Sequence, residues 1–154
     1  MIKVGDFMTR ELVTVKETDD LSLAESILRL GGIRHLPVVR DGLLVGLITQ
    51  RDLLRAGIPS AAARAMLARD VMTRDPTTVA PGSSLADAAR TLLRHKFGCL
   101  PVCEDGGKLV GIITESDFVR FAADVVQDLD LVQDAVGAAG DPEGMAPGRR
   151  PFPG

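Results

Sequence analysis

The chain has almost no aromatic residues: its 154 residues include five Phe but no Trp and no Tyr. The core must therefore be aliphatic, and aromatic platforms for stacking nucleic-acid bases are nearly absent. Basic charge is also scarce, because 18 Lys and Arg stand against 21 Asp and Glu, which gives a net charge of −3. Proteins that bind phosphate backbones need a basic surface, so a nucleic-acid partner is not expected.

Long apolar runs and cysteines are scarce as well. No run approaches the roughly eighteen apolar residues of a membrane-spanning helix, and no apolar stretch follows a basic start as in a signal peptide. We therefore expect neither a membrane partner nor secretion. The two cysteines, Cys99 and Cys103, do not resemble a disulfide framework. A reducing cytoplasm is the expected location.

What the sequence does contain is an internal repeat. Residues 6–52 align with residues 70–117 when Gly107 is left unpaired, and 20 of the 47 positions are identical. The matching motifs are "DFMTRELVTV" with "DVMTRDPTTV", "HLPVVRDG" with "CLPVCEDG", and "LVGLITQRD" with "LVGIITESD". Such identity indicates a tandem duplication. Because a unit of about fifty residues buries little surface alone, we expect the copies to pack together about a pseudo-twofold axis.

Each copy has the pattern strand, helix, strand, strand, helix. In the first copy, the β-prone "LVTV" precedes "TDDLSLAESILRLGG", whose apolar residues recur at helical spacing. The apolar runs "RHLPVV" and "LLVGLIT" flank "RDG", which predicts a hairpin, and "QRDLLRAG" begins the closing helix. In the second copy, Ser84 and Asp87 form a capping-box motif before the first helix. The expected fold class is mixed α+β, with two β-α-β-β-α repeats.

The repeats leave a joining segment and a C-terminal region. We expect five segments: repeat 1 (1–57), a linker (58–69), repeat 2 (70–122), a C-terminal helix extension (123–136) and a disordered tail (137–154). The extension belongs to an amphipathic helix over 118–136, whose apolar residues recur at helical spacing. That face could pack on its own domain, form a dimer seam or fit a partner's groove. The tail is rich in Gly and Pro.

A Thr-x-x-Asp motif follows an apolar run in both copies, as Thr49 with Asp52 and as Thr114 with Asp117. At a helix start this motif is typical of a capping box, in which each side chain satisfies a backbone N–H of the other residue. The same place suits a ligand, because a helix N-terminus attracts phosphate and an aspartate can accept two hydrogen bonds from a ribose diol. The two roles are compatible, and the residues leave both open.

Basic residues distinguish the first copy from the second. Arg34 and His35 precede a strand, where they either are solvated or contact phosphate, and Arg51 could add a third cation. The second copy has Gly-Cys in place of Arg-His and Ser116 in place of Arg51. If both copies bind a ligand, we therefore expect them to bind differently, with phosphate in the first copy and a less anionic ligand, or none, in the second.

Neither a metal site nor a catalytic site is expected. His95, Cys99 and Cys103 are spaced by four residues, but Pro101 prevents one continuous helix through the cysteines, and three ligands make a poor zinc site. His35 and His95 have no nucleophile or acid at a recognisable catalytic spacing.

The motifs, in this order and repeated twice, resemble the cystathionine-β-synthase (CBS) domain pair, also called a Bateman module. The resemblance rests on "DFMTRELVTV", "IRHLPVV" and "LVGLITQRDLL" with their partners "DVMTRDPTTV", "FGCLPVC" and "LVGIITESDFV", and it covers residues 4 to about 122. It implies repeats packed sheet to sheet, usually dimerised into a flat disc. It also implies an adenosine ligand, such as AMP, ADP, ATP or S-adenosylmethionine, bound between the repeats, without catalysis or a catalytic cofactor.

The resemblance further implies which residues touch the ligand. The two motif aspartates would contact ribose, the two motif threonines would lie near ribose or phosphate, and the basic residues would meet phosphate. The first strands, which end at Thr14 and Thr78, would line the adenine pocket, although threonine is also common in edge strands. The expected ligand-binding residues are Thr14, Arg34, His35, Leu36, Pro37, Thr49, Arg51, Asp52, Thr78, Leu100, Pro101, Thr114, Ser116 and Asp117.

Two functions fit these observations. In the first, a cytoplasmic homodimer binds an adenosine-type ligand, and binding shifts the packing between repeats in a way that a separate, unidentified protein partner senses. In the second, the repeats are a dimerisation or interaction scaffold with vestigial sites, and the Thr-x-x-Asp motifs are only helix caps. An enzyme would need a catalytic constellation that the sequence does not display.

Overall fold

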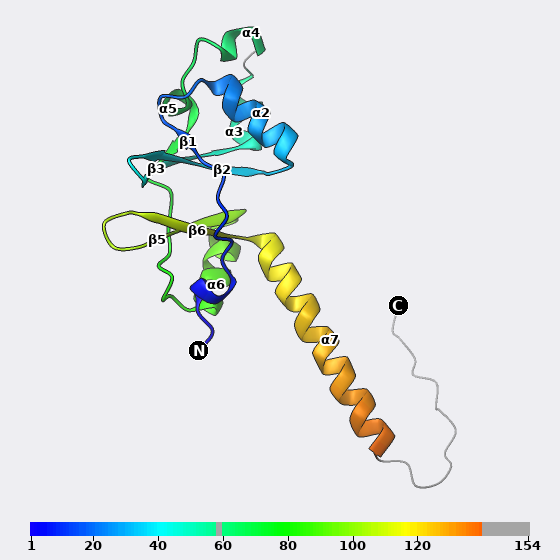
Figure 1. The fold of residues 1–154 in the computed structure, drawn as a ribbon. Coiled ribbons are helices and arrows are strands. Elements are labelled where there is room, and N and C mark those ends of the chain that lie inside the picture. Colours follow the sequence, from blue (N-terminus) through cyan, green and yellow to red (C-terminus); the bar gives the residue numbers. More distant parts are fainter. Residues whose placement is uncertain (58–59, 140–154) are drawn as a thin grey trace. The chain divides into compact units, whose positions relative to one another are not determined.

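The computed structural model describes residues 1–57 and 60–139 (Figure 1). Residues 1–118 form one compact unit, and the chain from Val119 onward belongs to a second. The elements of the first repeat are α1 (Val4–Phe7), β1 (Val15–Lys16), α2 (Leu21–Gly31), β2 (His35–Arg40), β3 (Leu43–Thr49) and α3 (Gln50–Ala56). The remaining elements are α4 (Ser60–Ala63), α5 (Ala68–Val71), β4 (Thr73–Arg74), α6 (Leu85–His95), β5 (Cys99–Cys103), β6 (Leu109–Thr114) and α7 (Glu115–Ala139).

The long helix of each repeat begins after the capping residue that the sequence indicates. Asp20 caps α2 by accepting a hydrogen bond from the Leu23 N–H at 2.8 Å. Ser84 caps α6 by accepting one from the Asp87 N–H at 3.3 Å. Each helix ends where the next residue turns left-handed: Gly32 after α2 and Lys96 after α6. The mixed α+β pattern predicted from the repeat is confirmed.

The central strands of each repeat form an antiparallel hairpin, β2 with β3 and β5 with β6. The first hairpin turns on Asp41 and Gly42, both at positive φ, which is the two-residue turn that matches the twist of the strands. The second hairpin turns through Gly106 and the additional Gly107, also at positive φ. The two turns also meet each other, because the Leu44 N–H donates to the Gly107 carbonyl at 3.0 Å.

Two aliphatic cores lie beneath the two hairpins. In Figure 1, α2 and α5 lie on the outer side of the β1–β2–β3–β4 sheet, and α1 and α6 lie on the outer side of the β5–β6 sheet. The first core includes Leu21, Leu36 and Ile48, and the second includes Leu100 and Ile113, all at most 1% exposed. The sheets therefore face each other, and each is covered on its far side by helices of its own core.

The N-terminal segment of each repeat is packed into the core of the other repeat. Val4 and Met8 belong to the second core, and Ala68 and Met72 belong to the first. The backbones of the two repeats also pair, because β4 of the second repeat lies antiparallel to β3 of the first. In the opposite direction, the Thr9 N–H donates to the carbonyl of Ile112 on β6 at 2.8 Å. Neither repeat buries its core without the other.

A methionine and a glycine make the closest of these reciprocal contacts. The Met72 side chain lies where a Cβ on Gly46 would stand, and the Met8 side chain lies where a Cβ on Gly111 would stand. Gly46 and Gly111 must therefore be glycine, because any side chain there would prevent the methionine of the other repeat from approaching the strand.

The structure differs from the sequence-based expectations at the first strands and at the C-terminus. The expected strand "LVTV" is reduced to Val15–Lys16, and its second-copy counterpart is a single parallel bridge between Val79 and Val102. The segment expected to be a linker contains α4 and the start of α5. The tail was expected from residue 137, but α7 continues to Ala139, because two alanines extend a helix well; residues 140–154 lie outside the described residues.

Replacing Gly46 by Ala should destabilise the fold by about 1–3 kcal/mol, because the new methyl group collides with the buried Met72 side chain. Removing that side chain with Met72→Ala should relieve part of the penalty in a double-mutant cycle measured by urea unfolding. Met8→Ala is the matched control, since it should relieve Gly111→Ala but not Gly46→Ala. Strictly additive effects in both matched pairs would contradict the exchanged packing.

Candidate ligand-binding site

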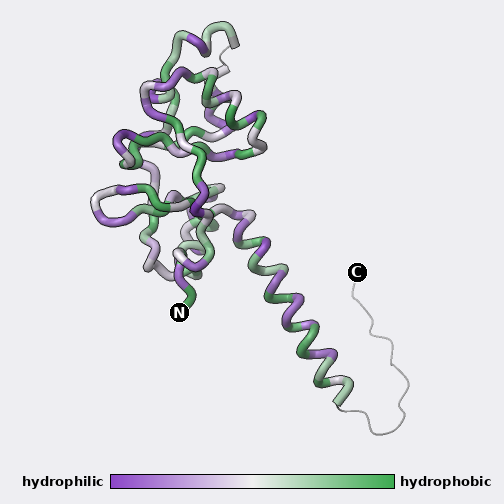
Figure 2. Tube along the Cα trace, in the orientation of Figure 1, coloured by the Kyte–Doolittle hydropathy of each residue, from purple (hydrophilic) through white to green (hydrophobic). Residues whose placement is uncertain are grey.

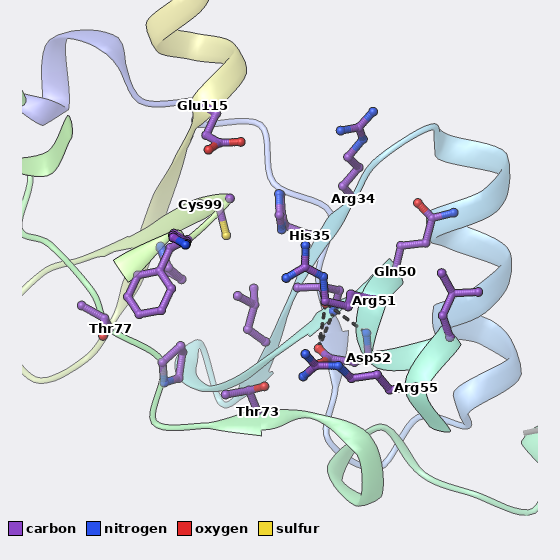
Figure 3. Close-up of a pocket in the computed structure, with 18 of the residues that line it drawn as sticks. Arg34, His35, Gln50, Arg51, Asp52, Arg55, Thr73, Thr77, Cys99 and Glu115 are labelled. Carbon is purple, nitrogen blue, oxygen red and sulfur yellow. Dashed lines mark hydrogen bonds between the residues drawn. The ribbon is translucent and has the colours of Figure 1, made fainter. Parts of the chain in front are cut away.

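A cleft of about 730 Å³ opens between the repeats within residues 1–118 (Figure 3). This volume lies within the range of small-molecule and cofactor sites, which is about 300–1,000 Å³. Its lining residues are Arg34, His35, Leu47, Thr49, Gln50, Arg51, Asp52, Leu54 and Arg55 from the first repeat, and Thr73, Asp75, Pro76, Thr77, Lys96, Phe97, Gly98, Cys99, Pro101 and Glu115 from the second. The two repeats thus contribute almost equally to one site.

The Thr49–Asp52 motif caps α3 and faces this cleft. The Asp52 N–H donates to the Thr49 hydroxyl oxygen at 3.2 Å, and Asp52 Oδ2 accepts from the Thr49 N–H at 2.9 Å. Asp52 Oδ2 also accepts from the Thr49 hydroxyl at 3.0 Å. The capping box is therefore confirmed, and the cap uses only one of the two carboxylate oxygens. Oδ1 is not required by the cap, so the helix-capping role and a ligand role do not compete for the same atom.

Residues 73–77 of the second repeat lie beside the capped N-terminus of α3, because β4 pairs with β3. Antiparallel pairing places Thr73 opposite Leu47, two residues before Thr49. The chain then continues through Asp75 and Pro76 to Thr77 along the cleft wall. The wall opposite the α3 N-terminus is consequently built from residues that lie more than twenty positions later in the sequence.

The charges around the cleft are mixed, with a small excess of cations. The basic lining residues are Arg34, Arg51, Arg55 and Lys96, and the acidic ones are Asp52, Asp75 and Glu115. Figure 3 shows Arg51, Asp52 and Arg55 projecting from α3, with Cys99 and Glu115 on the opposite side. The α3 N-terminus adds positive potential from its free N–H groups. The arrangement can hold an anionic group and, at Asp52, a group that donates hydrogen bonds.

His35 is the half-buried imidazole of the cleft. Its ring lies against the Gly98 backbone, where any side chain would collide with it. Its Nδ1 is fully buried and has no hydrogen-bond partner within the described residues. Burial lowers the pKa of His35, and the neighbouring Arg34 lowers it further, while Glu115 acts in the opposite direction. The imidazole is therefore neutral near pH 7 and can accept or donate a hydrogen bond.

The two cysteines are free, buried thiols. Cys99 lines the cleft and is 5% exposed, and burial raises its pKa to about 12. Burial also raises the pKa of Cys103. His95, the third member of the spacing that invites a metal interpretation, stacks on Phe97 at 5.1 Å between ring centroids. In the described ranges, 1–57 and 60–139, no three His, Cys, Asp or Glu side chains are grouped as metal ligands.

The second Thr-x-x-Asp motif is more deeply buried than the first. Asp117 is only 9% exposed, whereas Asp52 is half-buried. Asp117 Oδ2 accepts hydrogen bonds from the Thr114 N–H at 2.8 Å and from the Thr114 hydroxyl at 3.2 Å. In both motifs the aspartate Oδ2 accepts from the threonine N–H and hydroxyl, but the carboxylate of the second motif is less accessible.

The cleft contains six of the fourteen residues expected to bind the ligand: Arg34, His35, Thr49, Arg51, Asp52 and Pro101. The other eight, which do not line this cleft, are Thr14, Leu36, Pro37, Thr78, Leu100, Thr114, Ser116 and Asp117. Leu36 and Leu100 are fully buried members of the two cores, so they support the cleft from behind. Thr77 lines the cleft in place of its neighbour Thr78.

Several lining residues were missed by the sequence reasoning. Arg55 follows Arg51 by four positions, so the helical periodicity of α3 places both on one face, and this signal was available. Gly98, Cys99 and Glu115 were assigned to the second copy's own site, but they lie across from His35 in the same cleft. The approach of the His35 ring to Gly98 is a tertiary contact between repeats, which no local pattern predicts.

Comparison with known proteins decides the family. The sequence profile described as "CBS domain" matches the chain twice, over residues 4–58 and 68–124. The chain belongs to the CBS domain family. The two matched stretches coincide with the two repeats, so the molecule contains a CBS domain pair, and its cleft lies between the two domains.

Solved structures of other CBS pairs share this fold. AcuB from Vibrio cholerae is 41% identical with a TM-score of 0.76, and the alignment covers 84% of this chain and 96% of AcuB. CBSX2 of Arabidopsis thaliana, solved in complex with AMP, is 35% identical with a TM-score of 0.72 over 81% of this chain and 98% of CBSX2. The CBS pair of protein MJ0100, solved with 5′-methylthioadenosine and S-adenosyl-L-methionine, is 27% identical with a TM-score of 0.70, over 80% and 97%.

The CBS pair spans less than half of the length of the first curated relatives that it matches, between 23% and 43%. They include inosine-5′-monophosphate dehydrogenase of Korarchaeum cryptofilum, which is 36% identical over 115 residues, 75% of this chain and 23% of the enzyme. The similarity to that enzyme therefore covers only a part of it. None of the helices described in this chain is long and apolar enough to span a membrane.

The depressed pKa of His35 predicts a pH dependence of stability. Because the unfolded chain binds a proton near the ordinary pKa of 6.5 and the folded state binds it only at lower pH, the free energy of unfolding should fall as pH drops below about 6.5. His35→Gln should flatten this fall in urea titrations between pH 7.5 and 5.5, while His95→Gln is the control. A His35 resonance titrating above 6.5 in NMR would contradict the burial described here.

Proposed function

We propose that the chain is a regulatory CBS pair that binds an adenosine-type ligand, namely AMP, ADP, ATP or S-adenosylmethionine, in the cleft between its repeats. The observation that carries the proposal is the half-buried Asp52 at the N-terminus of α3, which faces the cleft with one oxygen not used by the cap. The complexes of related CBS pairs with AMP and with S-adenosyl-L-methionine support the ligand class.

Asp52 would hold the ribose. A diol presents two hydroxyl donors at a fixed separation, and an ionised carboxylate is a strong acceptor for both. Thr49 holds the carboxylate in place with two hydrogen bonds, so the side chain needs little reorganisation on binding. This preorganisation also explains why the same motif serves as cap and as ligand contact.

The basic residues would bind the phosphate. Arg51 lies one position before Asp52 on the first turn of α3, where a phosphate also meets the free N–H groups of the helix. Arg34, Arg55 and Lys96 line the same cleft and give the phosphate alternative partners. A guanidinium offers paired donors to phosphate oxygens, so these contacts favour nucleotides over uncharged nucleosides.

Apolar residues of both repeats would enclose the base. Leu47, Pro76, Phe97 and Pro101 line the cleft beside the polar groups. Phe97, whose ring is stacked on His95, adds an aromatic side chain to this apolar wall. His35 lines the same cleft and is expected to be neutral near pH 7, so it adds no charge next to the base.

Regulation would follow from the shared cleft. Because both repeats contribute walls, a ligand contacts both and biases the packing between them, which a separate protein partner can sense. We expect the chain to act as a homodimer in a reducing cytoplasm, where the two buried thiols would stay free. The scaffold alternative, in which the Thr-x-x-Asp motifs only cap helices, predicts that no adenosine ligand binds.

Isothermal titration calorimetry of the purified chain with AMP, ADP, ATP and S-adenosylmethionine tests the proposal. At least one should bind more tightly than about 1 mM, and Asp52→Asn should weaken that ligand at least about tenfold, because the amide replaces an ionised acceptor. The amide oxygen of the new side chain can still accept the hydrogen bond from the Thr49 N–H, so the variant should keep its fold.

Asp117→Asn is the matched control, as it makes the same change in the more deeply buried second motif. It should weaken the tightest ligand much less than Asp52→Asn does. Equal losses from both variants would contradict the assignment to the first copy. If none of the four ligands binds at millimolar concentration, the sensor proposal is wrong and the scaffold is favoured.

A further inference from the structure

The C-terminal part of α7 carries a continuous apolar seam at coiled-coil spacing. Its members recur alternately three and four residues apart and are Ala122, Val125, Leu129, Val132, Val136 and Ala139. In heptad notation, Leu129 occupies an a position and Val132 a d position. Figure 2 shows the alternation of hydrophobic and hydrophilic residues along this helix. A repeat of 3.5 residues is the pattern that keeps one seam facing a second helix over several turns.

The seam is exposed within the described chain. Val125 is 39% exposed, Leu129 56%, Val132 59% and Val136 67%. Helices in proteins gain most of their stability from packing an amphipathic face against another element. A contiguous row of large apolar side chains is rarely left in water. An exposed seam of this length therefore indicates an interaction surface.

The charges on this helix identify the kind of partner. Asp124, Asp130 and Asp134 lie at the c, b and f positions, away from the seam, and only Asp128 flanks it, at a g position. The e position paired with it in a parallel dimer is Gln133, which is uncharged, so a second copy meets no like charge there. A basic partner helix would instead require acidic residues at several flanking e and g positions, which this seam does not have.

We propose that this seam pairs with the same seam in a second copy of the chain, through a helix-to-helix contact made by residues 122–139. The surface is apolar at its centre and nearly free of charge at its flanks, so it is complementary to itself. This contact involves none of the cleft residues, and its existence does not depend on the proposed ligand.

Site-specific cross-linking of the full chain tests the contact. Val132→Cys places a thiol at the middle of the seam, and Asp134→Cys places one two residues further on, on the outer face of the helix. Paired helix axes lie about 8–10 Å apart, so seam thiols of two copies come within reach of a short bismaleimide, whereas outer-face thiols do not. The native Cys99 and Cys103 are buried, and the wild-type chain reports any reaction through them.

We expect a covalent dimer from Val132→Cys and none from Asp134→Cys. Two further substitutions in the Val132→Cys background sharpen the test, because Leu129 and Leu131 are similarly exposed, at 56% and 61%, but only Leu129 lies on the seam. Leu129→Asp should abolish the cross-link and Leu131→Asp should preserve it. Absence of the dimer from Val132→Cys, or equal cross-linking through position 134, would overturn the proposal, whatever the outcome of the ligand titrations.

Discussion

The rest of the structure depends on one reciprocal contact: a methionine of each repeat packs on a strand glycine of the other repeat. Met72 lies over Gly46 and Met8 lies over Gly111, and each methionine is a buried member of the opposite core. A repeat of about fifty residues buries too little apolar surface to be stable alone. Because residues of both repeats form each core, the two repeats together bury enough apolar surface, and the duplicated chain folds as a unit.

The site follows from that reciprocal contact. The segment that carries Met72 continues directly into Thr73, which pairs with β3, and then into the cleft wall opposite Asp52. One stretch of chain therefore completes the first core and the proposed binding site together. A second close contact between the repeats places the His35 ring against Gly98, and burial lowers the pKa of this imidazole. The proposed ligand binding would consequently be coupled to repeat packing through shared residues rather than through a separate relay.

Local patterns in the sequence predicted the repeats, the hairpins and the helix caps, because turn glycines, capping residues and apolar periodicity act over a few residues. The Thr49–Asp52 motif was predicted as a cap or a ligand contact; its geometry confirms the cap, and the ligand contact stays a proposal. Sequence reasoning could not place Gly98 and Cys99 in the same cleft as His35, since that proximity is created only when the repeats pack. Leu36 was expected in the ligand site because the family resemblance implied an apolar wall there, but its side chain is buried in the first core.

The central claim is that one ligand contacts both repeats in a single cleft. Amide hydrogen exchange of the intact chain with and without AMP tests it most directly, because it reports on each backbone segment separately. AMP should slow exchange in two segments together, 47–55 and 72–78, and should have a smaller effect on 112–118. Protection confined to 112–118, or to only one of the first two segments, would contradict a first-copy site built by both repeats.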